Sequence, residues 1–280
     1  MRVKVNGVRL FVDVEGAKLV PDGPRMREKP TLILLHGGPG GDHSNYKPEF
    51  SRLSDACQVI YYDQRGQGRS DESSPELWTL DQWADDLVGL CEALEIERPV
   101  VMGGSFGGYV AIAYATRYPD HPSKLIFCST RAQAPDFERS LTVYERLGGV
   151  DARAVAAGFF ADPSRANTDK FFRVCVPLYF RTPPDPNSMR RAIRKPQVAE
   201  HFRRGELLKM NYLPALSNIK CPTLVIGGED DPQIPIEDQV DIANAISPPL
   251  VQFCRVPNAG HFVFRDDPLV LDTIREFILT

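Results

Sequence analysis

The stretch Val101–Tyr109, which reads VMGGSFGGY, predicts both the fold and the place where chemistry occurs. It sets the pattern G-x-S-x-G between the apolar run Pro99–Met102 and the helix-like run Tyr109–Tyr118. A serine on a sharp turn from a strand into a helix has a strained backbone, so its neighbours have to be small. The hydroxyl of Ser105 then projects at a helix N-terminus, where a base can reach it and a developing anion is stabilised. An ordinary glycine-rich turn is the alternative, and the flanking strand and helix favour the nucleophile.

The composition is that of an ordinary globular protein. Of the 280 residues, 42% are hydrophobic and 25% are charged, and the net charge of −4 gives no reason to expect nucleic acid or an anionic membrane as a partner. No signal peptide and no run of about 18 apolar residues is visible. The six cysteines are scattered without a C-x-x-C pair, so we expect no metal and no cofactor. We therefore expect a cytoplasmic protein that acts on a small molecule, while its oligomeric state stays open.

Apolar runs separated by helical patterns predict an α/β fold. The first run, Val8–Val14, alternates and suits an antiparallel edge strand, whereas the later runs are mostly continuous, as in parallel strands buried on both faces. A capping-box signature, Thr79-x-x-Gln82, opens one of the helices between them. Alternation of this kind implies a mostly parallel sheet with flanking helices. The later runs are Thr31–Leu35, Val59–Tyr62, Val100–Met102, Lys124–Cys128, Thr223–Ile226 and Val251–Val256.

One region interrupts this alternation and predicts an inserted helical lid. Residues 131–213 contain no convincing strand, and they carry 15 Lys and Arg against 9 Asp and Glu. The insertion follows a strand whose carboxyl end faces the same rim as Ser105, which favours a lid over a helical layer without a role. We expect a core of residues 1–130 and 214–280 with a cap of residues 131–213. Its predicted helices are Phe137–Leu147, Ala152–Phe160, Lys170–Phe180 and Met189–Phe202.

A serine needs a base to remove its proton, and His261 is the best candidate. It lies in the loop Asn258–Phe262, just after the run Val251–Val256, where the chain order Ser, Asp, His places the base. His36, in the glycine-rich segment His36–Gly40, is expected to brace that loop. The other three histidines have polar neighbours and are expected at the surface: His43, His121 and His201.

The base needs a carboxylate to orient it, and three follow the run Thr223–Ile226. We prefer Asp231, three residues after the turn glycine Gly228, because that position points back toward the histidine. Asp230 is the alternative. Glu229 is expected to satisfy backbone donors in the turn.

An oxyanion needs two preorganised N–H donors. One is expected from Phe106, the residue after the nucleophile, and the other from Gly38, with Gly37 as the alternative. The loop of Gly37 and Gly38 lacks the pattern G-x-x-x-x-G-K-[ST] and contains Pro39, so we do not expect it to bind a nucleotide.

Together, three segments resemble the proline iminopeptidase branch of the α/β-hydrolase fold: His36–Gly40 (HGGPG), Asp63–Ser70 (DQRGQGRS) and Gly103–Gly108 (GGSFGG). The resemblance covers nearly the whole chain. It implies a serine hydrolase that removes N-terminal residues, often proline, from short peptides, or cleaves related amides and esters. It also implies a triad of Ser105, Asp231 and His261, with Gly38 and Phe106 as oxyanion donors. Asp63 and Arg65 are then structural residues of the loop beside the site.

The chain departs from the family pattern at two places. Phe106 stands where the family commonly has Trp, and the predicted lid contains neither of the two tryptophans, Trp78 and Trp83. Family lids carry glutamates in a W-E context that hold the substrate's amino group; here Tyr144-Glu145 is the nearest analogue, and Glu200 and Glu206 are further carboxylates.

The basic lid also suits a substrate amine poorly, because like charges repel.

The sequence leaves three hypotheses about the function open. The first is an iminopeptidase-like hydrolase of small amides or peptides. The second is an esterase, lactonase or other small-acyl hydrolase without aminopeptidase activity. The third is a non-catalytic ligand-binding protein on a hydrolase scaffold.

Overall fold

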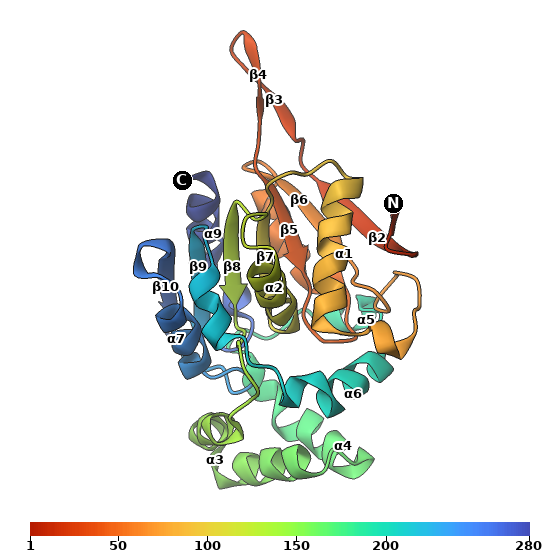
Figure 1. Ribbon diagram of the computed structural model, residues 1–280. Helices are drawn as coiled ribbons and strands as arrows, with labels where there is room; N and C mark the ends of the chain where they lie inside the picture. The colour runs from red at the N-terminus through yellow and green to blue at the C-terminus, as the bar shows by residue number, and fades with distance from the viewer.

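The computed structural model describes residues 1–280, except for the side chain of Met189, and it contains an eight-stranded sheet with helices on both faces (Figure 1). The strand order is β1-β2-β6-β5-β7-β8-β9-β10. The pairs β1–β2 and β2–β6 are antiparallel, and all other neighbours in the sheet are parallel, so the predicted α/β-hydrolase fold is confirmed. The strands are β1 (Arg2–Val5), β2 (Val8–Glu15), β5 (Thr31–Leu35), β6 (Gln58–Tyr62), β7 (Val100–Gly104), β8 (Lys124–Cys128), β9 (Thr223–Gly228) and β10 (Val251–Val256).

The central strands are buried on both faces because helices cover each side of the sheet. Along β5, Ile33 and Leu35 join the core on one face, and Leu32 and Leu34 join the core on the other. The first core is closed by α1 (Leu80–Ala93), α2 (Phe106–Arg117) and α7 (Ile236–Ala245), and the second by α8 (Val263–Asp266) and α9 (Leu269–Leu279). This two-sided burial explains why these strands are continuously apolar in sequence.

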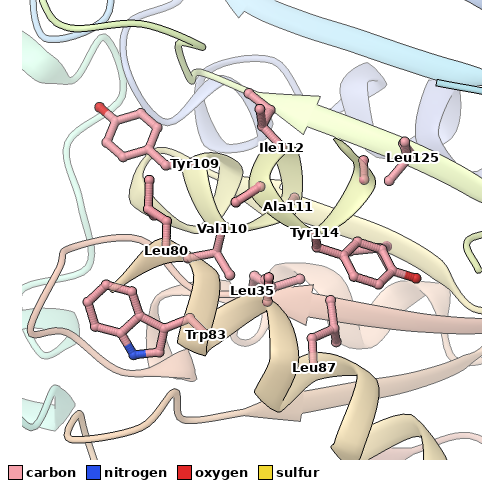
Figure 2. Close-up of a cluster of buried hydrophobic side chains, with 14 of the residues drawn as sticks. Leu35, Leu80, Trp83, Leu87, Tyr109, Val110, Ala111, Ile112, Tyr114 and Leu125 are labelled. Carbon is pink, nitrogen blue, oxygen red and sulfur yellow. The ribbon is translucent and has the colours of Figure 1, made fainter. Parts of the chain in front are cut away.

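Helix α1 begins where the capping signature predicts. The Thr79 hydroxyl accepts a hydrogen bond from the Gln82 N–H at 3.2 Å, which satisfies one of the free donors of the first turn. Figure 2 shows Leu80, Trp83 and Leu87 of α1 gathered around Val110 of α2 and Leu35 of β5. The packing of α1 on α2 thereby fixes the helix that follows Ser105.

Two strands outside the main sheet form a hairpin that sequence patterns did not predict. Strands β3 (Leu19–Asp22) and β4 (Arg25–Glu28) pair antiparallel through a turn at Gly23, where φ is 57°. The hairpin projects from the end of the molecule opposite the inserted helices (Figure 1). Most of its side chains are exposed, so it has no apolar alternation that would reveal it.

The region between β8 and β9 is built from helices and turns, with one isolated bridge between Gln133 and Asn211. Two predicted helices join into α3, which is broken at Gly149, where φ is 74°. The predicted helix Met189–Phe202 is instead split in two, since Pro196 begins α6. We call residues 131–213 the cap segment. Its helices are α3 (Phe137–Ala161), α4 (Arg165–Val174), α5 (Ser188–Arg191) and α6 (Pro196–Arg204).

Helix α6 lies between the sheet core and the pair α3 and α4 (Figure 1).

Within the described residues, no helix has both the length and the apolar character needed to cross a bilayer. The remaining helical turns are η1 (His43–Tyr46), η2 (Glu49–Leu53), η3 (Pro75–Leu77), η4 (Val176–Tyr179), η5 (Glu206–Leu208), η6 (Leu213–Asn218) and η7 (Pro248–Leu250).

Candidate active site

Ser105 occupies the strained turn between β7 and α2 that the sequence predicts. Its φ of 53° and ψ of −122° are rare for a residue with a side chain. The turn is so tight that a Cβ added at Gly107 would lie 1.9 Å from the carbonyl oxygen of Leu35. The Ser105 N–H donates to the Cys128 carbonyl at 3.0 Å, which ties the turn to the end of β8. The serine is therefore held by the surrounding backbone.

His261 and Asp231 form a buried pair. The His261 Nδ1 and the Asp231 Oδ2 are 2.7 Å apart, and the carboxylate has no solvent exposure. The other oxygen of Asp231 accepts the N–H groups of Gln233 and Ile234, each at 2.9 Å. When Nδ1–H donates to this carboxylate, the neutral ring presents the lone pair of Nε2. That is the arrangement of a general base.

The two carboxylates next to Asp231 are engaged elsewhere. Asp230 forms an ion pair with Arg146 at 2.5 Å, and Glu229 forms one with Arg255 at 3.3 Å. The structure thus places Asp231, the preferred candidate, against His261. Glu229 was expected to satisfy backbone donors, and it pairs with a side chain instead.

The sheet brings the candidate residues to one edge. Ser105 follows β7, Asp231 follows β9 and His261 follows β10, and these strands run parallel. The carboxyl ends of parallel strands meet at the same edge, which is where open α/β sheets bind their ligands. In Figure 1 this edge faces the cap segment.

The loop after β5 lies directly against the serine turn. A Cβ added at Gly37 would lie 3.3 Å from the Ser105 Cβ, so the two backbones are in near contact. Gly38 has a φ of 133°, which a residue with a side chain adopts only with strain. Phe106 is the first residue of α2, where N–H groups have no acceptor within the helix. Gly37 therefore lies beside Ser105, and the N–H of Phe106 follows Ser105 directly at the helix end. The roles of Gly38 and Phe106 as oxyanion donors stay a prediction.

His36 braces this loop, as expected. Its Nε2 accepts the Gln64 N–H at 3.1 Å, so in the neutral ring the proton sits on Nδ1, which donates to the Gly37 carbonyl at 2.8 Å. The ring has no solvent exposure, and burial lowers the pKa of His36 despite the nearby carboxylates of Asp63 and Asp42. His36 is therefore held neutral.

The expectation that His43 lies at the surface is wrong. Its ring is buried, stacks on Phe11 at a centroid distance of 5.5 Å, and bonds through Nδ1 to Asp63 at 2.7 Å. The polar neighbours Asp42 and Ser44 hide this burial in the sequence. His121 is half-buried beside a tyrosine, and His201 is exposed.

Asp63 and Arg65 have the structural roles that the resemblance implies. Besides binding His43, Asp63 accepts the N–H of Arg69 at 2.7 Å. The guanidinium of Arg65 forms two hydrogen bonds of 2.7 Å with Asp86, and both side chains are buried.

The cap segment contacts both sides of the site through residues that sequence patterns did not reveal. The Tyr179 carbonyl accepts the His261 N–H at 2.8 Å, and its hydroxyl donates to the Gln233 Oε1 at 2.5 Å. Burial raises the pKa of Tyr179, so this hydroxyl keeps its proton. On the other side the Lys195 N–H donates to the Gly40 carbonyl at 2.7 Å. The cap segment is thereby anchored to the base loop and to the glycine-rich loop.

Helix α6 covers Phe106. The ring of Phe202 lies 5.1 Å from that of Phe106 and 6.1 Å from that of Tyr109, and Trp83 packs on Phe106 from the other side at 5.0 Å. No local pattern could have predicted this contact, because the partners lie about a hundred residues apart.

Each of the four glutamates of the cap segment has a partner of its own. None of the partners is a residue of the candidate site. Glu138 and Glu145 pair with Arg153, Glu200 pairs with Arg204, and Glu206 accepts the Leu80 N–H.

Comparison with known proteins identifies the family. Residues 30–268 match the model of the alpha/beta hydrolase fold family, and the chain belongs to this family. It is similar to a proline iminopeptidase of Lactobacillus helveticus, with 33% identity over 222 residues that cover 73% of this chain and 75% of the relative. A second relative is the proline iminopeptidase PfmaB of Pestalotiopsis fici, with 30% identity over 96% of this chain and 98% of the relative. The protein is accordingly a hydrolase.

Solved structures agree with this fold. A thermophilic esterase from Thermogutta terrifontis, determined with malate bound, superposes with a TM-score of 0.70 at 28% identity, covering 100% of this chain and 99% of the esterase. The proline iminopeptidase of Mycobacterium smegmatis superposes with a TM-score of 0.77 at 22% identity, covering 99% of this chain and 97% of that protein. The second likeness supports the fold alone.

The neutral state of His36 predicts an acid-sensitive stability. Because its pKa is lowered in the folded state, the unfolded chain takes up a proton below about pH 6.5 and the folded protein does not. The free energy of unfolding should therefore decrease as the pH falls from about 6.5 toward the lowered pKa, by up to about 1.4 kcal/mol per pH unit. Urea unfolding of the wild type and of His36→Gln at several pH values from 7 to 5 measures this decrease. The free energy of unfolding of the variant should depend less steeply on pH.

His201→Asn is the matched control, because His201 is exposed, and it should keep the wild-type slope. Equal slopes for the wild type and His36→Gln would contradict the assignment.

Proposed function

We propose that this hydrolase cleaves small acyl compounds, esters above all, through a Ser105-His261-Asp231 triad and an acyl-enzyme. Ser105 is the nucleophile, His261 the general base, and Asp231 holds the imidazole in the tautomer that presents Nε2. The N–H groups of Gly38 and Phe106 donate hydrogen bonds to the developing oxyanion. The cap segment, residues 131–213, covers the site on the core of residues 1–130 and 214–280.

The reaction has two halves. His261 Nε2 takes the proton of the Ser105 hydroxyl as its oxygen attacks the substrate carbonyl, whose oxygen moves toward the two N–H donors. The imidazolium then gives the proton to the leaving alcohol or amine, and the acyl group stays on Ser105. Water, deprotonated by the same nitrogen, attacks the acyl-enzyme and releases the acid.

The observation that carries this proposal is the buried contact between His261 and Asp231 at 2.7 Å, on the same sheet edge as the strained Ser105. A carboxylate with no solvent exposure that bonds the Nδ1 of a histidine orients the ring. A non-catalytic ligand-binding protein has no need of this combination.

Esters are favoured over N-terminal peptides because of the cap segment's charges. A peptidase that acts on free amino termini needs carboxylates to bind the ammonium group, and the four glutamates are engaged with other partners. Amide hydrolysis of the iminopeptidase type is the second candidate, since relatives of 30 to 33% identity are named proline iminopeptidases.

Ser105→Ala should lower kcat/KM for any accepted substrate by about 10³-fold or more, because the variant loses the nucleophile and keeps the fold. The measurement is kcat/KM on a panel of short-chain 4-nitrophenyl esters and on prolyl and alanyl 4-nitroanilides. We expect the wild type to prefer the esters. A variant that kept most of the wild-type activity would rule out Ser105 as the nucleophile, and faster anilide cleavage would favour the iminopeptidase.

Asp231→Asn and Asp230→Asn form a matched pair of neighbouring carboxylates. Asp231→Asn should lower kcat on the order of 10³- to 10⁴-fold, because an amide at this position favours the wrong histidine tautomer. Asp230→Asn removes only an ion pair with the exposed Arg146 and should change kcat less than about threefold. The opposite ranking in steady-state assays would assign the acid to Asp230.

A further inference from the structure

The last turn of α6 carries an arginine on the inner side of the cap segment. Arg203 follows Phe202, whose ring covers Phe106 beside the nucleophile. The Arg203 guanidinium lies over the ring of Phe159 at 5.3 Å, and that ring stacks on Phe171 at 4.2 Å. The stacking holds the cation between α6 and the helices α3 and α4.

Arg203 lacks a carboxylate partner. Its neighbour Arg204 forms the ion pair with Glu200 at 2.9 Å, and among the described residues no acidic side chain forms an ion pair with Arg203. Solvent reaches the Arg203 side chain, yet burial by the surrounding protein lowers the pKa of its guanidinium.

Ring contacts lead from Arg203 toward the proposed active site. The ring of Phe171 lies 6.5 Å from that of Tyr179, and the Tyr179 ring lies 5.7 Å from that of His261. The rings of Phe159, Phe171 and Tyr179 thus connect Arg203 to the base.

We propose that Arg203 binds an anionic group of the substrate, a carboxylate in the first instance, so that the preferred substrate is a small ester or amide with a negative charge remote from the scissile carbonyl. This inference rests on the proposed function. Within the described part of the chain Arg203 forms no ion pair with an acidic side chain, and its planar guanidinium can bind a substrate carboxylate through two N–H groups. The positive charge of residues 131–213, with 15 Lys and Arg against 9 Asp and Glu, acts in the same direction.

The test compares two esters of equal acyl length, 4-nitrophenyl hydrogen glutarate and 4-nitrophenyl pentanoate, which differ in the terminal carboxylate. The wild type should prefer the glutarate ester in kcat/KM by about tenfold or more. In Arg203→Met, which keeps the length and apolar contact of the stem, the glutarate-to-pentanoate ratio should fall by at least about tenfold. Arg203→Lys should keep part of the preference, and Arg204→Met should keep all of it.

Calorimetric binding of free glutarate to the same four proteins separates this inference from the proposed function. Binding should be weakened by Arg203→Met and not by Arg204→Met. If neither ester is cleaved but glutarate binds in this Arg203-dependent way, the proposed function fails and the anion site stands. Two results would overturn the inference. The first is a wild-type ratio of kcat/KM for the glutarate ester to kcat/KM for the pentanoate ester near one. The second is that Arg203→Met and Arg204→Met have equal effects on this ratio and on glutarate binding.

Discussion

The site depends on how closely the first turn of α2 packs against the end of β5. The backbone at Gly107 leaves no space for a side chain beside the Leu35 carbonyl, and Ser105 consequently takes a φ of 53°. The same contact brings the helix N-terminus against the loop of Gly37 and Gly38. One steric constraint therefore fixes the backbone of the serine turn against the loop of Gly37 and Gly38.

Hydrogen bonds hold several buried polar groups around this turn in place. His36 is held neutral by an acceptor on one nitrogen and a donor on the other, and Asp231 is held as an acceptor of three hydrogen bonds. Arg131, which is buried, donates to the Gln233 carbonyl and pairs with Asp238, so the acid loop is fixed from a second side. These hydrogen bonds hold the acid loop in place, and small displacements of the base are costly in such a site.

Much of the architecture could be predicted from the sequence because the signals are local. The strands Thr31–Leu35, Lys124–Cys128 and Val251–Val256 have the predicted bounds, since each is an apolar run with clear ends. The choice of Asp231 followed from its distance to a turn glycine. The hairpin of β3 and β4 was missed because its side chains are mostly exposed.

The cap segment was predicted as a helical insertion but not in detail. Pro196 divides the predicted helix Met189–Phe202, whereas Gly149 breaks α3 between the two predicted helices Phe137–Leu147 and Ala152–Phe160, as expected. The contacts of Tyr179 with His261 and of Phe202 with Phe106 join residues far apart in the chain, so no periodicity could reveal them. For the same reason the burial of His43 against Asp63 depends on tertiary contacts that its polar neighbours conceal.

The most direct test asks whether the three side chains at this sheet edge act together. The wild type is treated with a fluorophosphonate probe, and the labelled peptide is located by mass spectrometry. We predict a single adduct on Ser105 that forms rapidly in the wild type and far more slowly in His261→Ala, because the serine then lacks a base. An adduct on another residue, or labelling of His261→Ala at the wild-type rate, would contradict the proposed triad.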